Sequence, residues 1–131
     1  MFTSSISIHK TIKGKLPRLP FSEMKNAVLG KKYVLELIFV GDAKAQRLNK
    51  LYRGKTYVPN VLSFPLSLTH GEIFMNLRVA RKQAPSHRMK EGDFIAFLFI
   101  HSLFHLKGYD HGSRMERGEE KVLKKFKVNF S

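Results

Sequence analysis

The chain has 131 residues, which is enough for one domain with its own hydrophobic core, and we expect residues 1–131 to form a single domain. It contains no cysteine, which excludes a disulfide framework, a thiolate zinc finger, an iron–sulfur cluster and a cysteine nucleophile. Lys and Arg number 24 against 10 Asp and Glu, and the resulting net charge of +14 favours a polyanionic partner, above all nucleic acid.

The N-terminal third alternates short strand and helix patterns. Alternating residues predict a strand over Ser5–His9, and Ser22 is a suitable N-cap for a helix that runs to Leu29 and ends at Gly30. The aromatic and β-branched run Tyr33–Val40 predicts a buried strand. A second helix follows, with Asp42 as its cap and apolar residues at helical spacing through Tyr52.

The middle of the chain is basic and then strand-like. Arg53–Asn60 is predicted to be a basic loop, and Val61–Phe64 a short strand that Pro65 ends. Alternation over Glu72–Leu77 predicts a strand with one solvated side, followed by a short helix over Arg78–Ala84.

Helices dominate the C-terminal part, which favours an α+β fold over a strict repeat of strand and helix. Glu91–Leu106 is apolar on most faces, so we expect a helix buried in the domain centre that Gly108 stops. Ser113 begins a last, amphipathic helix. The longest apolar run, Phe94–Ile100, is far shorter than the ~20 residues that cross a bilayer, so we expect no membrane segment and a cytoplasmic protein.

Three of the six histidines lie close together, at His101, His105 and His111. Residues four apart on a helix share one face, so the first two imidazoles can bind one metal ion. Gly108 lies between the second and third histidines, and a glycine readily adopts the left-handed backbone that reverses a chain. The spacing therefore predicts a metal site with three protein ligands and an open position, as in catalytic rather than structural zinc sites.

Neutral imidazoles suit Zn²⁺ first, and Ni²⁺ or another divalent ion is an alternative. The histidine spacing matches the H-E-x-x-H-x-x-G-x-x-H pattern of zinc peptidases, but Ser102 stands where those enzymes have their glutamate base. A hydroxyl with an ordinary pKa cannot accept a proton as that carboxylate does, which argues against peptidase chemistry.

The segment from His101 to His111 resembles the H-G-x-L-H-L-x-G-Y-D-H signature of the YbeY endoribonuclease family, known for ribosomal RNA maturation. Ser102, Phe104 and Glu72 depart from the family pattern, and the three histidines do not. The resemblance extends over most of the chain, from about Val34 to Phe126. Its earlier blocks are Leu48-Asn49, Tyr52–Lys55, Asn60–Pro65 and Gly71–Ile73.

This resemblance implies an α+β fold with a small mixed sheet flanked by helices, and a central helix carrying the metal ligands. It implies one zinc ion per chain, held by His101, His105 and His111, and a functional arginine at Arg53. It further implies cleavage of single-stranded RNA at the 3′ end of the 16S rRNA precursor and a part in ribosome quality control. The small ribosomal subunit and the Era GTPase are the implied protein partners.

Other readings stay open at this point. The leading alternative is a non-catalytic ribosome assembly factor with a structural zinc site. A zinc peptidase is a less favoured alternative. If RNA is cleaved, the residues leave open whether water or the 2′-OH is the nucleophile. Tyr57 is suited either to base stacking or to packing, and Asp110 either to orienting a ligand or to capping the last helix. A second basic cluster is suited to RNA binding or to a solvated surface: Arg78, Arg81, Lys82, Arg88 and Lys90.

Overall fold

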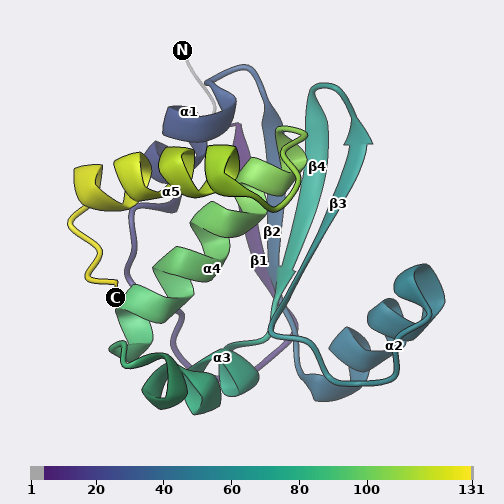
Figure 1. The fold of residues 1–131 in the computed structure, drawn as a ribbon. Helices are drawn as coiled ribbons and strands as arrows, with labels where there is room; N and C mark the ends of the chain where they lie inside the picture. The colour runs from purple at the N-terminus through teal and green to yellow at the C-terminus, as the bar shows by residue number, and fades with distance from the viewer. Residues whose placement is uncertain (1–4, 131) are drawn as a thin grey trace.

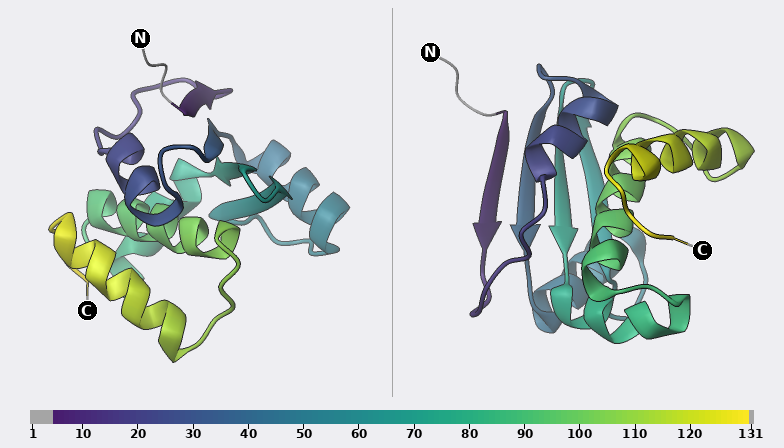
Figure 2. Two further views of the ribbon diagram at one scale, coloured as in Figure 1. Left: turned by 90° about the horizontal axis from the view of Figure 1, so that it is seen from above. Right: turned by 90° about the vertical axis from the view of Figure 1, so that its left-hand side faces the viewer.

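The computed structural model describes residues 5–130 and contains a four-stranded mixed β-sheet with helices on both faces (Figures 1 and 2). The strand order across the sheet is β1-β2-β4-β3. β1 pairs with β2 and β2 with β4 in parallel, whereas β3 and β4 are antiparallel. The predicted α+β class and mixed sheet are therefore confirmed. The strands are β1 (Ile6–Lys10), β2 (Val34–Phe39), β3 (Val61–Ser67) and β4 (His70–Met75).

The inner face of the sheet supplies much of the hydrophobic core. In β2, Leu35, Leu37 and Phe39 are fully buried and alternate with half-buried or exposed residues, because successive side chains of a strand point to opposite faces. Ile73 and Met75 of β4 lie beside Leu37 and Phe39 in register and are equally buried. This continuous apolar face is the surface on which the central helix packs.

Helix α4 runs through the middle of the molecule, between the sheet and α5 (Figures 1 and 2). It contacts β3, α1, α3 and α5, which explains why most of its faces are apolar. Helix α2 packs on the opposite face of the sheet, where the rings of Tyr52 and Phe64 lie 5.3 Å apart. The helices are α1 (Phe21–Leu29), α2 (Asp42–Arg53), α3 (Leu77–Gln83), α4 (Glu91–Leu106) and α5 (Ser113–Lys125), with a 3₁₀ turn over Ala84–His87.

The two helix caps predicted from the sequence are wrong. α1 begins at Phe21, directly after Pro20, and no side chain caps it, so Ser22 lies inside the helix. Asp42 lies in the first turn of α2 after the N-cap Gly41. Its carboxylate accepts hydrogen bonds from Arg78 Nε at 2.7 Å and Asn76 Nδ2 at 2.9 Å. Asp42, which the local sequence pattern predicted to cap α2, thus binds residues that are distant in the sequence.

Strand β3 does not end at Pro65, as predicted, but continues to Ser67. β3 is an edge strand that pairs only with β4, and an edge strand tolerates proline because one row of its backbone groups has no partner strand. The register shifts between Pro65 and Ser67, where the strand becomes exposed. Helix α4, by contrast, has the predicted bounds Glu91–Leu106. Within residues 5–130, no helix has both the length and the apolar character that a bilayer crossing requires.

Candidate metal centre

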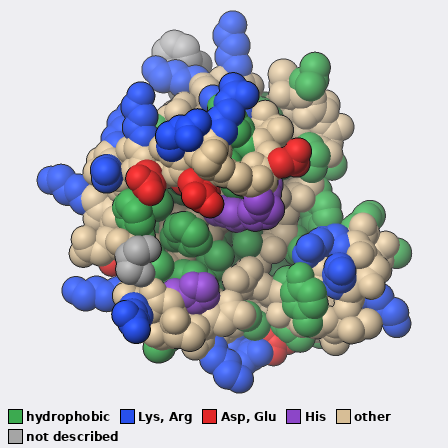
Figure 3. All heavy atoms as spheres, viewed as in Figure 1, with side chains coloured by type: hydrophobic (Ala, Val, Ile, Leu, Met, Phe, Trp, Pro, Cys, Tyr) green, Lys and Arg blue, Asp and Glu red, His purple; other side chains and the backbone are tan. Residues whose placement is uncertain are grey.

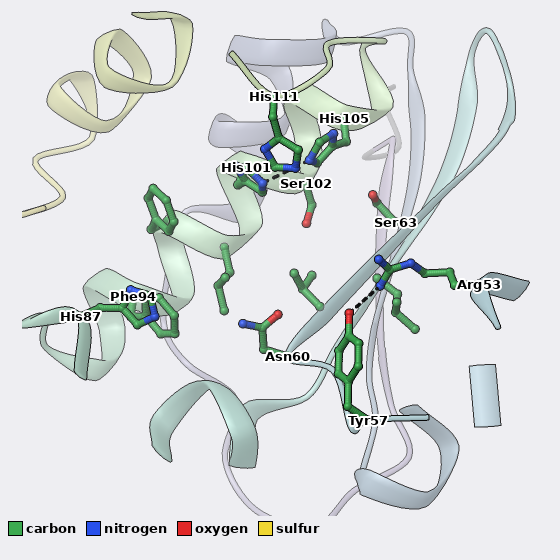
Figure 4. A pocket seen from close by; sticks show the side chains of 14 residues that line it. Arg53, Tyr57, Asn60, Ser63, His87, Phe94, His101, Ser102, His105 and His111 are labelled. Carbon is green, nitrogen blue, oxygen red and sulfur yellow. Dashed lines mark hydrogen bonds between the residues drawn. The ribbon is translucent and has the colours of Figure 1, made fainter. Parts of the chain in front are cut away.

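The three histidines predicted as ligands lie together at the C-terminal end of α4. His101 and His105 are one turn apart on the helix, and Gly108 takes a left-handed φ of 104° just after it. The chain then returns with His111 above both rings (Figure 4). One ring nitrogen from each histidine lies within 4.8 Å of the others.

These nitrogens fit a single metal ion. The Nε2 atoms of His101 and His105 are 3.1 Å apart. A tetrahedral site with bonds of ~2.0–2.1 Å separates its ligand nitrogens by ~3.3 Å, so the pair already has the spacing that such an ion requires. His111 is exposed while the other two are partly buried, which leaves one side of the cluster open to solvent.

Hydrogen bonds on the far side of two rings orient them. The Nδ1–H of His101 donates to Glu119 Oε2 at 2.6 Å, and the Nδ1–H of His105 donates to the Tyr109 carbonyl at 3.2 Å. Each bond leaves Nε2 as the free acceptor atom that faces the cluster. Such partners of ligand imidazoles set the tautomer and raise metal affinity.

Glu119 is a site residue that the sequence reasoning missed. It lies on α5 and is 6% exposed, a rare burial for a carboxylate unless it is paired. The signal was present in the pattern, because Glu119 lies between Met115 and Leu123 at four-residue steps, inside the apolar face of that helix. An acidic residue in an apolar helical stripe indicates a buried polar partner, which here is His101.

Close packing of α5 on α4 lets Glu119 reach His101. The residue before it, Gly118, lies against the ring of Phe104, and a Cβ there would come within 2.7 Å of Phe104 Cε1. Any larger residue would therefore push the two helices apart or displace that ring.

The surroundings of His105 favour its neutral form. Burial, together with the neighbouring His101, lowers the pKa of His105 below its ordinary value. A neutral imidazole is the form that binds metal ions, so the environment of His105 prepares it as a ligand.

The histidine cluster opens into a cleft of about 520 Å³ between α4 and the loop that follows α2. Arg53 and Tyr57 line the opposite wall, with Ser63 and Ser102 between them and the histidines (Figure 4). The floor is apolar, and no Asp or Glu is among the residues that line this cleft. Figure 3 shows the histidines at the edge of this hollow, with Lys and Arg side chains spread around it.

Arg53 is held in place by two neighbours. Its Nη1 donates to Asn49 Oδ1 and to the Tyr57 hydroxyl, both at 3.1 Å. Asn49 is fully buried and also donates through Nδ2 to the Tyr57 carbonyl at 3.0 Å, which ties the loop to α2. The αL residue Gly54 ends the helix directly after Arg53. The guanidinium therefore faces the histidines from a braced position.

Three features had two possible interpretations from the sequence: Tyr57, Asp110 and the second basic cluster. Tyr57 is 53% exposed and its hydroxyl accepts a hydrogen bond from Arg53, so it is not packed in the core, and its stacking on a base stays a prediction. Asp110 is exposed, and the N-cap of α5 is Gly112 with no side-chain cap bond, so the capping interpretation is wrong. In the second basic cluster, Arg78 pairs with Asp42 at 2.7 Å and Arg81 lies 3.7 Å from Glu91, so part of its charge is neutralised locally.

Comparisons with known proteins agree with the motif. The family model described as Endoribonuclease YbeY matches residues 4–127. Curated proteins of that name from Mycoplasma mycoides subsp. mycoides and Mycoplasma capricolum subsp. capricolum are 35% and 38% identical, over 68% and 59% of this chain. The chain spans 59% and 54% of their lengths, less than two thirds in each case. Another, from Aster yellows witches'-broom phytoplasma, is 36% identical over 76% of this chain and 77% of its own.

A solved structure shares the fold. The solution structure of a Thermotoga maritima protein superimposes with a TM-score of 0.66 over 92% of this chain and 88% of that chain, at 24% sequence identity. At this sequence identity, the similarity supports a common arrangement of helices and strands and nothing about function.

Proposed function

The chain belongs to the YbeY family, and from this premise we propose that it is a metal-dependent endoribonuclease that cleaves single-stranded RNA. The observation that carries the proposal is the set of three imidazole nitrogens within 4.8 Å of one another, open to a cleft that Arg53 faces. A binding site with this donor set and one free side is typical of catalytic metal centres.

In this proposal His101, His105 and His111 hold one Zn²⁺ per chain, and Ni²⁺ or another divalent ion is the alternative. A divalent ion bound there supplies a Lewis acid next to the scissile phosphodiester. Glu119 and the Tyr109 carbonyl hold the rings of His101 and His105 so that both Nε2 atoms face the ion.

Arg53 is the catalytic residue we propose on the other wall. Its guanidinium keeps further N–H donors beyond those given to Asn49 and Tyr57, and a planar fork of donors matches the oxygens of a phosphate. Because Asn49 and Tyr57 fix its position in advance, the charge does not have to reorganise as negative charge develops on the phosphoryl group.

A peptidase is disfavoured by the composition of the cleft. Peptidases with this histidine spacing use a carboxylate as the base, and none lines this cleft. Glu119 contacts one proposed ligand, but it accepts from Nδ1 of His101, on the side away from the open face. Ser102, at the position of that base, is buried.

The biological setting is proposed on the family alone. We place the activity in maturation of the 3′ end of 16S rRNA and in ribosome quality control in the cytoplasm. The small ribosomal subunit and the Era GTPase are its proposed partners, and residues 1–131 act as one domain. The net charge of +14 supports an RNA substrate, since phosphate contacts dominate the affinity of basic proteins for nucleic acids.

The test is cleavage of a labelled single-stranded RNA by the purified protein after metal content has been measured. Wild type is compared with His105→Ala, which removes a ligand, and with His9→Ala, a histidine on β1 outside the cleft. We expect about one metal per chain and cleavage in wild type and His9→Ala, with both lost in His105→Ala.

The ends of the products identify the nucleophile. A cyclic phosphate indicates attack by the 2′-OH, and a linear phosphate indicates attack by water. Full metal occupancy without any cleavage would instead favour the ribosome assembly factor with a structural ion.

A further inference from the structure

We propose that the cleft contains a stacking site for one unpaired nucleobase, formed by Phe97, one helical turn from the metal ligands, with Phe94 and then His87 next to it along the same wall. The inference rests on the proposed RNA substrate and adds where a base of that substrate lies.

One stripe of α4 faces the cleft and changes character along its length. Phe94, Phe97 and Leu98 line the cleft first, and His101, Ser102 and His105 follow at helical spacing. The aromatic part therefore begins about 6 Å along the helix axis from the first metal ligand. A nucleotide whose phosphate reaches the histidines has its neighbouring base within reach of these rings.

The rings form a nearly parallel series. His87 lies 4.5 Å from Phe94 with 24° between the ring planes. Phe94 lies 6.3 Å from Phe97 at 12°, and Phe97 lies 5.9 Å from His101 at 21°. These nearly parallel rings therefore form one aromatic wall of the cleft.

Phe97 differs from the other phenylalanines of the same helix. Phe94, Phe99 and Phe104 are 1%, 0% and 5% exposed, as core residues are, whereas Phe97 is only partly buried. The apolar floor that it shares with Val61 and Leu62 lies inside a cleft whose other wall carries the Arg53 guanidinium. Figure 3 shows hydrophobic side chains between two separate histidine patches on this face.

An apolar floor with a cationic wall suits a nucleotide better than a peptide or lipid. The base stacks on an aromatic face while its phosphate is neutralised, and stacking does not depend on base identity. Asn60 adds a polar group for the edge of the base: its Nδ2 donates to Gln83 Oε1 at 2.8 Å, and its amide faces the cavity (Figure 4).

The experiment is an abasic scan in a binding assay. A 2′-O-methylated, single-stranded RNA of about eight nucleotides is prepared with one nucleotide at a time lacking its base. Fluorescence anisotropy measures its affinity for the metal-loaded full chain, and electrophoresis confirms that the RNA stays intact. Phe97→Leu keeps an apolar side chain without the π face, and Phe97→Tyr keeps the face. Tyr52→Leu is the matched control, an exposed aromatic residue on α2 outside the cleft.

We expect Phe97→Leu to weaken binding of the fully base-bearing RNA by about 5- to 100-fold, and Phe97→Tyr and Tyr52→Leu to leave it near wild type. At one position of the scan, base removal should weaken wild type by a similar factor and leave Phe97→Leu unaffected. Circular dichroism melts check that each variant is folded.

Two negative results have different meanings. If wild type binds the RNA but no abasic position is coupled to residue 97, the stacking site is refuted and the endoribonuclease proposal stands. If the metal-loaded wild type does not bind single-stranded RNA at all, the proposed substrate itself is wrong.

Discussion

Replacing Glu119 by Gln should weaken metal binding while leaving the fold intact. The Gln amide oxygen can still accept the Nδ1–H of His101, so the tautomer is kept and the negative charge is lost. A hydrogen bond to a charged group contributes ~1.5–3 kcal/mol, which corresponds to a factor of ~10–150 in affinity. Because Glu119 is 6% exposed and its oxygen is 2.6 Å from His101, water does not compensate for the loss. We expect about tenfold weaker binding for Glu119→Gln and about a hundredfold for Glu119→Ala.

The assay is a competition titration of Zn²⁺ against a chromophoric chelator at constant pH. Glu120→Gln is the matched control, since it removes the same charge from the next residue of α5, which is exposed. The control separates the contact with His101 from the general effect of one less negative charge. Equal affinities for Glu119→Gln and Glu120→Gln would show that Glu119 does not act through His101.

Three further predictions follow from particular contacts. Arg53→Ala should lower the single-turnover rate at saturating RNA by ~10²–10³ with little change in affinity, and Arg53→Lys should recover it only in part; an unchanged rate would remove Arg53 from the site. In urea unfolding, Gly118→Ala should destabilise the protein by ~1–2 kcal/mol, because the added Cβ would collide with the Phe104 ring. Gly92→Ala on α4, where the added Cβ meets nothing within 4 Å, should stabilise it by up to ~1 kcal/mol, and equal effects of the two substitutions would contradict the packing argument. Hydrogen bonds from Arg78 and Asn76 lower the pKa of Asp42 in the folded protein. The ionised carboxylate therefore contributes fully to folding stability above the ordinary pKa of ~3.9, and this contribution is lost as the pH falls through the lower pKa of the folded state. Since that carboxylate is 41% exposed, Asp42→Asn should cost at most ~1 kcal/mol at neutral pH, and the difference from wild type in urea unfolding should narrow below about pH 4; a difference that does not change with pH would refute it.

Local patterns in the sequence were sufficient for some parts of this protein. The bounds of α4 were predictable because an apolar run that ends near a glycine leaves few alternatives. The approach of the three histidines was predictable for the same reason, since four-residue spacing on a helix and a left-handed glycine are local geometry. Assignment to the family also needed only the order of short motifs.

Other features were decided by contacts between distant segments. In the strand order β1-β2-β4-β3, the last strand of the chain, β4, lies between β2 and the edge strand β3, and no local pattern indicates this position. Asp42 bonds Arg78 and Asn76 instead of capping α2, because these long-range partners offer the carboxylate a charged and a neutral donor. β3 continues through Pro65 because it lies at an edge of the sheet, and its position there is a property of the assembled sheet.

In the candidate site, too, some features follow from the local sequence and others only from tertiary contacts. The sequence by itself determined that the three candidate ligands come together, since His101, His105 and His111 are positioned by one helix and its turn. Only the tertiary structure brought Glu119 behind His101, through the close packing of α5 on α4 at Gly118, and Arg53 to the opposite wall of the cleft. A helix sets the spacing of its own residues, whereas the distance between two elements depends on how their side chains pack, which is a property of the whole core.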